Sequence, residues 1–172
     1  MDERALFLAL RLLHIGFGVF WGGTMAMMAW FVIPSVRAAG PAGGRVMGEV
    51  IGTRRLPVWL GTAAGLTILS GAVMYWRLAR GGSGWAHSHM GITIGIGAAA
   101  ALVAYAIGMG VSVPTSKRIT ALGARMQSAG GPPDPAMAAE MQALQQRVHT
   151  VSRIIAMLVF TAVLAMAAAR YV

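Results

Sequence analysis

Four long apolar stretches constrain the fold of this chain more than any other feature. They cover residues 5–36, 57–78, 85–113 and 148–171. As a helix, each is long enough to cross about 30 Å of hydrocarbon at 1.5 Å per residue. The chain is 57% hydrophobic and 11% charged, whereas a soluble domain carries about 25% charged residues. The sequence therefore predicts a single all-α domain over residues 1–172, a polytopic four-helix bundle in the lipid of the cell (inner) membrane.

The basic residues predict how this bundle is oriented. Lys and Arg number 14 against 5 Asp and Glu, which gives a net charge of +9. They lie at span ends and in loops, where the positive-inside rule and lipid headgroups account for them, so we expect no nucleic acid partner. More Lys and Arg residues lie in the loops after the first and third spans than on the opposite side of the membrane, which carries the two termini and the loop after the second span. This bias predicts both termini outside and the two basic loops in the cytoplasm.

The connection between the third and fourth spans has helical features of its own. Residues 117–127 are expected to form a short surface helix, which the Gly-Gly-Pro-Pro run at 130–133 breaks. Asp134 then has the character of an N-cap, with Pro135 in the first helical position. We expect the helix that begins there to run into the fourth span. Since the chain has no cysteine, disulfides and thiolate-bound metal centres are excluded.

Two His-x-Gly signatures stand near the start of long apolar helices, at His14 and at His89. Each helix continues through small residues to a proline, Pro34 or Pro114, at which we expect the span to end. This weak repeat suggests two helical hairpins related by an axis along the membrane normal, although chance similarity explains it equally well. In such a bundle His14 and His89 lie opposite each other at similar depth.

Two imidazoles in that arrangement can bind one haem iron from opposite sides. An ionisable residue within a span, such as His14, indicates function by default. Gly18 and Trp21 lie on the same helical stripe as His14, and Gly97 lies on the stripe of His89. Small residues there leave room for a porphyrin, but they also permit tight helix packing without a cofactor. The pattern predicts haem b with His14 and His89 as iron ligands and Gly18, Trp21 and Gly97 beside it.

Other interpretations of these residues remain open. His87 is either a solvated loop residue or a substitute ligand, and His149, on the cytoplasmic side, is expected at a surface. Imidazole and thioether groups also suit copper, and Met25, Met27 and Met28 cluster in the first span. Methionine is, however, a routine apolar filler. A copper-handling membrane protein and a non-catalytic accessory subunit are therefore the alternatives to a haem protein.

Three short stretches resemble a known superfamily. Leu13-His14 followed by Trp21-Gly22-Gly23 resembles its L-H…W-x-G opening, Leu66 to Gly71 its L-T-x-x-S-G stretch, and Trp85 to Met90 the W-x-H-x-K-L start of its third span. The chain thus resembles the four-helix, haem-binding protoporphyrinogen oxidases and the related copper-resistance D membrane proteins. The resemblance implies that His14 and His89 lie around a haem.

The chain also departs from the oxidase pattern. His89 replaces a lysine, Tyr105 stands without the histidine expected beside it, and the N-E-x-P signature before the last span is missing. No carboxylate lies in the middle of a span, so the sequence identifies no reaction. Bis-histidine ligation leaves no open iron position, which favours electron transfer with a quinone or a redox protein as partner. Three G-x-x-x-G spacings, at Gly18/Gly22, Gly61/Gly65 and Gly91/Gly95, favour a homodimer or a larger complex.

Overall fold

The computed structural model describes residues 2–82, 84–129 and 134–172. Every regular element in these ranges is helical. Within them, four helices are long and apolar enough to cross a membrane: Glu3–Ala38, Leu56–Arg80, His89–Ser128 and Pro135–Tyr171. For the described residues, this confirms the prediction of an all-α chain with four helices long and apolar enough to span a membrane.

The first half of the chain forms two of these helices and the segment that joins them. It contains α1 (Glu3–Met27), the π-helical turn η1 (Met28–Val32), α2 (Ile33–Ala38), α3 (Gly40–Gly48), a second π-helical turn η2 (Glu49–Thr53) and α4 (Leu56–Arg80). The second half contains the 3₁₀ turn η3 (Trp85–His87), α5 (His89–Ile107), the π-helical turn η4 (Gly108–Ser112), α6 (Val113–Ser128), α7 (Pro135–Ala168) and the 3₁₀ turn η5 (Ala169–Tyr171).

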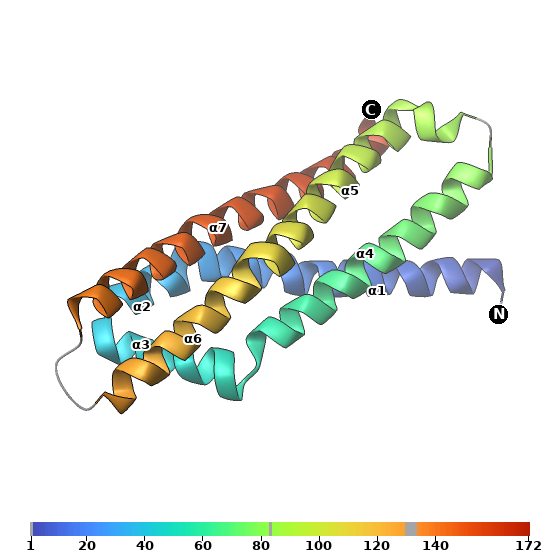
Figure 1. Ribbon diagram of the computed structural model, residues 1–172. Coiled ribbons are helices and arrows are strands. Elements are labelled where there is room, and N and C mark those ends of the chain that lie inside the picture. Colours follow the sequence, from blue (N-terminus) through green and yellow to red (C-terminus); the bar gives the residue numbers. More distant parts are fainter. Residues whose placement is uncertain (1, 83, 130–133) are drawn as a thin grey trace.

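The helices pack as two antiparallel pairs. The most extensive packing joins α1 to α4 and α5 to α7, while α1 with α7 and α4 with α5 make the smaller contacts between the pairs. Both termini lie at the same end of the bundle, where the start of α1 diverges from the end of α7 (Figure 1). The first turns of α1 therefore depend on α4 for their packing.

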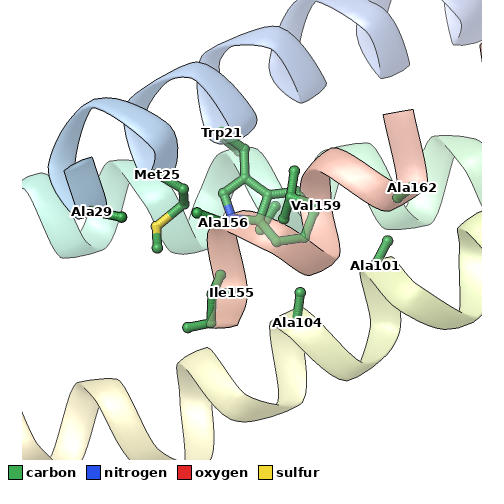
Figure 2. Close-up of a cluster of buried hydrophobic side chains, with 11 residues drawn as sticks. Trp21, Met25, Ala29, Ala101, Ala104, Ile155, Ala156, Val159 and Ala162 are labelled. Carbon is green, nitrogen blue, oxygen red and sulfur yellow. The ribbon is translucent and has the colours of Figure 1, made fainter. Parts of the chain in front are cut away.

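The hydrophobic core lies where all four long helices, α1, α4, α5 and α7, approach one another. Trp21 is only 5% exposed and, with Met25, packs among buried residues of α7 such as Ile155 and Val159. Figure 2 shows these side chains together with the alanines of α5 and α7. Alanine lets helix backbones approach closely, as membrane helices require, and the indole of Trp21 fills the space that the small residues leave.

The prolines do not end their helices, contrary to the sequence-based expectation. Pro34 and Pro114 each fall in the first turn of a helix that directly continues a π-helical turn. A proline within a regular α-helix lacks one N–H and clashes with the carbonyl one turn earlier, and a π-helical turn is one of the adjustments that accommodate it. Residues 117–127 are helical as expected, within α6 (Val113–Ser128), but this helix is continuous with the third span from His89 onward and is not a separate element.

The fourth long helix begins as expected. It starts at Pro135, and a side-chain oxygen of Asp134 accepts a hydrogen bond of 2.9 Å from the backbone N–H of Ala136. The helix then continues without interruption to Ala168. The N-cap and the long helix into the fourth span are confirmed, while the expected break at 130–133 lies outside the described residues.

The π-helical turns η1 and η4 give a common register for both halves of the chain. They begin at residues 28 and 108, and the prolines stand at 34 and 114, so each pair is 80 residues apart. In this register His14 corresponds to residue 94, five residues after His89. At 1.5 Å per residue, His89 lies about 8 Å nearer than His14 to the end that carries the termini.

Candidate functional site: the histidine held between two helices

His14 makes a defined contact between α1 and α4. Its half-buried side chain places Nδ1 2.8 Å from the backbone carbonyl oxygen of Thr67. A carbonyl oxygen only accepts hydrogen bonds, so Nδ1 carries a proton and donates it. In the neutral imidazole this leaves Nε2 as the nitrogen with a free lone pair.

Gly71 provides the space in which this imidazole lies. A Cβ atom at Gly71 would stand 2.7 Å from Cε1 and 2.9 Å from Nδ1 of His14. No ordinary packing contact is that short, so the ring occupies the place that any larger residue would take. Absence of a side chain at this position lets α1 present an imidazole directly to the backbone of α4.

The hydroxyl groups near Gly71 donate hydrogen bonds to backbone carbonyl oxygens of α4 itself. The Ser70 hydroxyl donates to the carbonyl oxygens of Leu66 at 2.6 Å and Thr67 at 3.1 Å. Thr67 is buried, and its hydroxyl donates to the Ala63 carbonyl at 2.8 Å. These hydroxyls are thus satisfied within α4, and only the Thr67 carbonyl faces His14. We call Thr67, Ser70 and Gly71 the His14 seat.

Sequence reasoning missed the role of these three residues. They belong to the stretch Leu66 to Gly71, which was noted only for its resemblance to a family motif. A signal was present, since three small or hydroxylated residues interrupt one face of an otherwise apolar helix. Pairing that face with His14 required the packing of α1 on α4.

The hydrogen bond to Thr67 fixes the tautomer and the ring orientation of His14. Histidines that bind a metal usually donate their other ring N–H to a carbonyl or carboxylate, which fixes the tautomer and the ring orientation. His14 fulfils this condition through Thr67. A haem, if bound, would be held by Nε2 of His14, the ring nitrogen that the hydrogen bond to Thr67 leaves free.

His89 and His87 lie in a different environment. Both side chains are exposed, His89 in the first residue of α5 and His87 in the preceding turn. Between them, Ser88 caps α5: its hydroxyl accepts from the Gly91 N–H at 3.1 Å and donates to the Trp85 carbonyl at 2.6 Å. No hydrogen bond joins His14 to His89 in the part of the chain that is described.

The other residues expected beside a cofactor take part in helix packing. A Cβ atom at Gly18 would lie 3.5 Å from Cγ2 of Thr67. Trp21 is buried in the core, and Gly97 faces α7, where a Cβ atom would lie 3.1 Å from the Ala162 carbonyl oxygen. All three positions bring helices together.

The remaining histidine and the methionines are not gathered at a common centre. His149 is half-buried on α7. Met25 is buried in the core, whereas Met27 is 55% exposed. Over the described ranges, no three His, Asp or Glu side chains form a group that could hold a metal ion. The hydrogen-bonded His14 is thus the most defined candidate ligand.

The chain was also compared with family models, with curated proteins and with solved structures, and none of the three comparisons gives a match.

Proposed function

We propose that this protein binds haem b in the membrane, with Nε2 of His14 as an axial ligand and His89 as the second, and that it transfers electrons. The hydrogen bond from His14 to the Thr67 carbonyl carries the proposal, because it orients the imidazole as a ligand. The resemblance of the chain to haem-binding four-helix membrane proteins supports the same function.

Each residue of the His14 seat has a part in this function. The Thr67 carbonyl keeps the proton on Nδ1 and increases the basicity of Nε2. Gly71 admits the ring, and Ser70 donates a second hydrogen bond to the same carbonyl oxygen. When bound, a bis-histidine haem supplies a one-electron redox centre without an open coordination position.

His89 is the proposed second ligand for two reasons. It belongs to the other helix pair, and α5 begins at the same end of the bundle as α1 (Figure 1). The bound haem would have to be tilted to bridge the roughly 8 Å by which His89 stands nearer that end than His14. The exposed side chain of His89 also carries no hydrogen bond among the described residues. His87 is the substitute candidate in the adjoining turn.

We further propose that the termini face outward, as the distribution of basic residues favours, and that a quinone or a redox protein exchanges electrons with the haem. A homodimer would use Gly61 and Gly65 of α4, which have no atom near enough to contact an added Cβ. The other two G-x-x-x-G pairs contact neighbouring groups within this bundle. A copper-handling role and a non-catalytic accessory role remain the competing functions.

An optical spectrum of the purified protein tests the proposal. We expect a Soret band and, after reduction, sharp α and β bands. His14→Ala should abolish the spectrum and added imidazole should restore it, because imidazole can occupy the vacated position. His89→Ala should convert a six-coordinate into a five-coordinate spectrum, and His149→Ala should leave the spectrum unchanged. A colourless protein with stoichiometric copper would support the copper function, and one that binds neither would support the accessory role.

A further inference from the structure

A groove rich in arginine lies between α1 and α4 at the end of the bundle that carries the termini. It is a shallow, open depression lined by arginines, one glutamate and apolar residues of both helices: Glu3, Arg4, Phe7, Leu8, Arg11, Arg77 and Leu78. The groove thus combines three guanidinium groups and one carboxylate with an apolar wall. Neither the haem ligands nor the core packing of the bundle uses it.

The positive charge of the groove is poorly compensated. Nη1 of Arg77 lies 3.9 Å from Oε1 of Glu3, but the Arg77 side chain is 33% exposed and that of Glu3 is 92% exposed. Because the Glu3 carboxylate is almost fully solvated and stands at the edge of ion-pair distance, it attracts the Arg77 guanidinium only weakly. Arg4 and Arg11 have no carboxylate within 4.0 Å among the described residues.

The other two arginines at this end of the bundle are engaged differently. The guanidinium of Arg80 lies 4.5 Å from the ring centroid of Trp76, and that of Arg170 lies 5.1 Å from the ring centroid of Tyr171. Neither lines the groove. Arg80 and Arg170 therefore serve as matched controls with the same charge at the same end of the molecule.

The length of α4 places the groove at the level of lipid headgroups. Its 25 residues span about 37 Å at 1.5 Å per residue, slightly more than the roughly 30 Å of hydrocarbon. Arg77 stands in the last turn of α4, and the neighbouring Trp76 is 55% exposed, as an interfacial aromatic would be. Arg11 lines the same groove and therefore lies at the same level.

We propose that this groove binds the phosphate of an anionic phospholipid. Guanidinium groups bind phosphate oxygens in a bidentate manner, and basic sites between membrane helices are known to hold lipid headgroups. Free phosphate has the same chemistry, but Phe7, Leu8 and Leu78 provide an apolar wall that suits the glycerol and acyl part of a lipid. The binding does not depend on a haem or on the orientation of the protein.

Native mass spectrometry of the full chain in a neutral detergent tests this site. Phosphatidylglycerol and phosphatidylcholine with identical acyl chains are the probes. We expect wild-type protein to retain phosphatidylglycerol preferentially, and Arg11→Gln/Arg77→Gln to lose roughly tenfold or more in that affinity, tenfold being the least expected for the loss of one charge-assisted hydrogen bond. Arg80→Gln/Arg170→Gln, with the same change in charge, should bind as the wild type does.

Three results would overturn the proposal: no preference for the anionic lipid in the wild type, an equal loss of affinity in both double variants, or inorganic phosphate stabilising the protein against thermal unfolding as strongly as phosphatidylglycerol does. If Arg11→Gln/Arg77→Gln fails to fold, Arg11→Lys/Arg77→Lys takes its place. Lysine keeps the charge but not the bidentate geometry, so a measurable loss of affinity is still expected and unchanged affinity contradicts the proposal.

Discussion

Nδ1 of His14 lies 2.8 Å from the carbonyl oxygen of Thr67, so a side chain of α1 is bound to a backbone acceptor in the middle of α4. Gly71, one turn after Thr67, makes this contact possible because its missing side chain leaves room for the ring. Stability of the α1–α4 pair and orientation of the imidazole thus depend on the same glycine.

Substitution of Gly71 should therefore affect both properties. In Gly71→Ala the added methyl group would meet Cε1 of His14 at 2.7 Å, which forces the ring to move and breaks its bond to Thr67. We expect a loss of about 1–3 kcal/mol in the free energy of unfolding, as for other overpacked positions. Gly23→Ala is the control, since nothing lies within 4 Å of a Cβ there. Equal stability of the two variants, measured by reversible unfolding in mixed micelles, would contradict the contact.

A second glycine fixes the start of α5. An added Cβ at Gly91 would collide with the Trp85 carbonyl oxygen and lie 2.9 Å from Cα of Ala86. Both are backbone atoms and cannot rotate away. We expect Gly91→Ala to open the turn before α5 and to cost about 2 kcal/mol or more.

Gly95→Ala, one turn later, is the matched control for Gly91→Ala. Its added Cβ would lie 3.6 Å from the Tyr75 hydroxyl, an ordinary contact distance. Hydrogen exchange at residues 85–90 should accelerate in Gly91→Ala and stay unchanged in Gly95→Ala. Unchanged exchange in both variants would show that the turn tolerates the methyl group.

The contact between the two helix pairs can be tested by cross-linking. A Cβ at Gly22 would lie 3.1 Å from Cγ1 of Val159, and among the described residues no other heavy atom of a neighbouring helix lies within 4 Å of it. The two Cβ atoms are thus slightly more than 4 Å apart, in the upper part of the range of about 3.5–4.5 Å found in disulfides. Because the chain contains no cysteine, Gly22→Cys/Val159→Cys introduces the only two thiols. Oxidation should abolish their reaction with a maleimide. The pair Gly23→Cys/Val159→Cys should keep its thiols reactive, because Gly23 has no atom within 4 Å of an added Cβ.

Labelling of single thiols in intact cells measures the proposed orientation. Gly44 in α3 and Gly82 after α4 are both exposed, and neither has an atom within 4 Å of an added Cβ. With the termini outside, an impermeant maleimide should label Gly82→Cys directly and Gly44→Cys only after permeabilisation. The reverse pattern would place the basic loops outside.

The sequence predicted the spans of this molecule better than their ends. Apolar runs of sufficient length indicate membrane helices by themselves, and the Asp134-Pro135 pair correctly marked the start of α7. The prolines misled because their penalty in a regular helix is large. A π-helical turn relieves that penalty, and nothing in the local sequence indicates that the turn will form.

The candidate site was likewise predicted only in part from the sequence. Its histidine was found from the sequence, because an ionisable residue among apolar neighbours is conspicuous. Its partners, Thr67 and Gly71, were not found, because their roles depend on which helix packs against α1 and in which register. The same knowledge was needed to see that Gly97 serves helix packing and that His89 stands nearer the bundle's end than His14.

The π-helical turns η1 and η4 also change how the surfaces of these helices must be assigned. Each turn adds one residue to the winding, which rotates all later side chains by about 100° relative to an unbroken helix. A helical wheel drawn straight through Pro34 or Pro114 would therefore assign lipid-facing residues to the partner-facing side. A mutational scan of these helices therefore needs two helical wheels for each span, one for the residues before the π-helical turn and one for those after it.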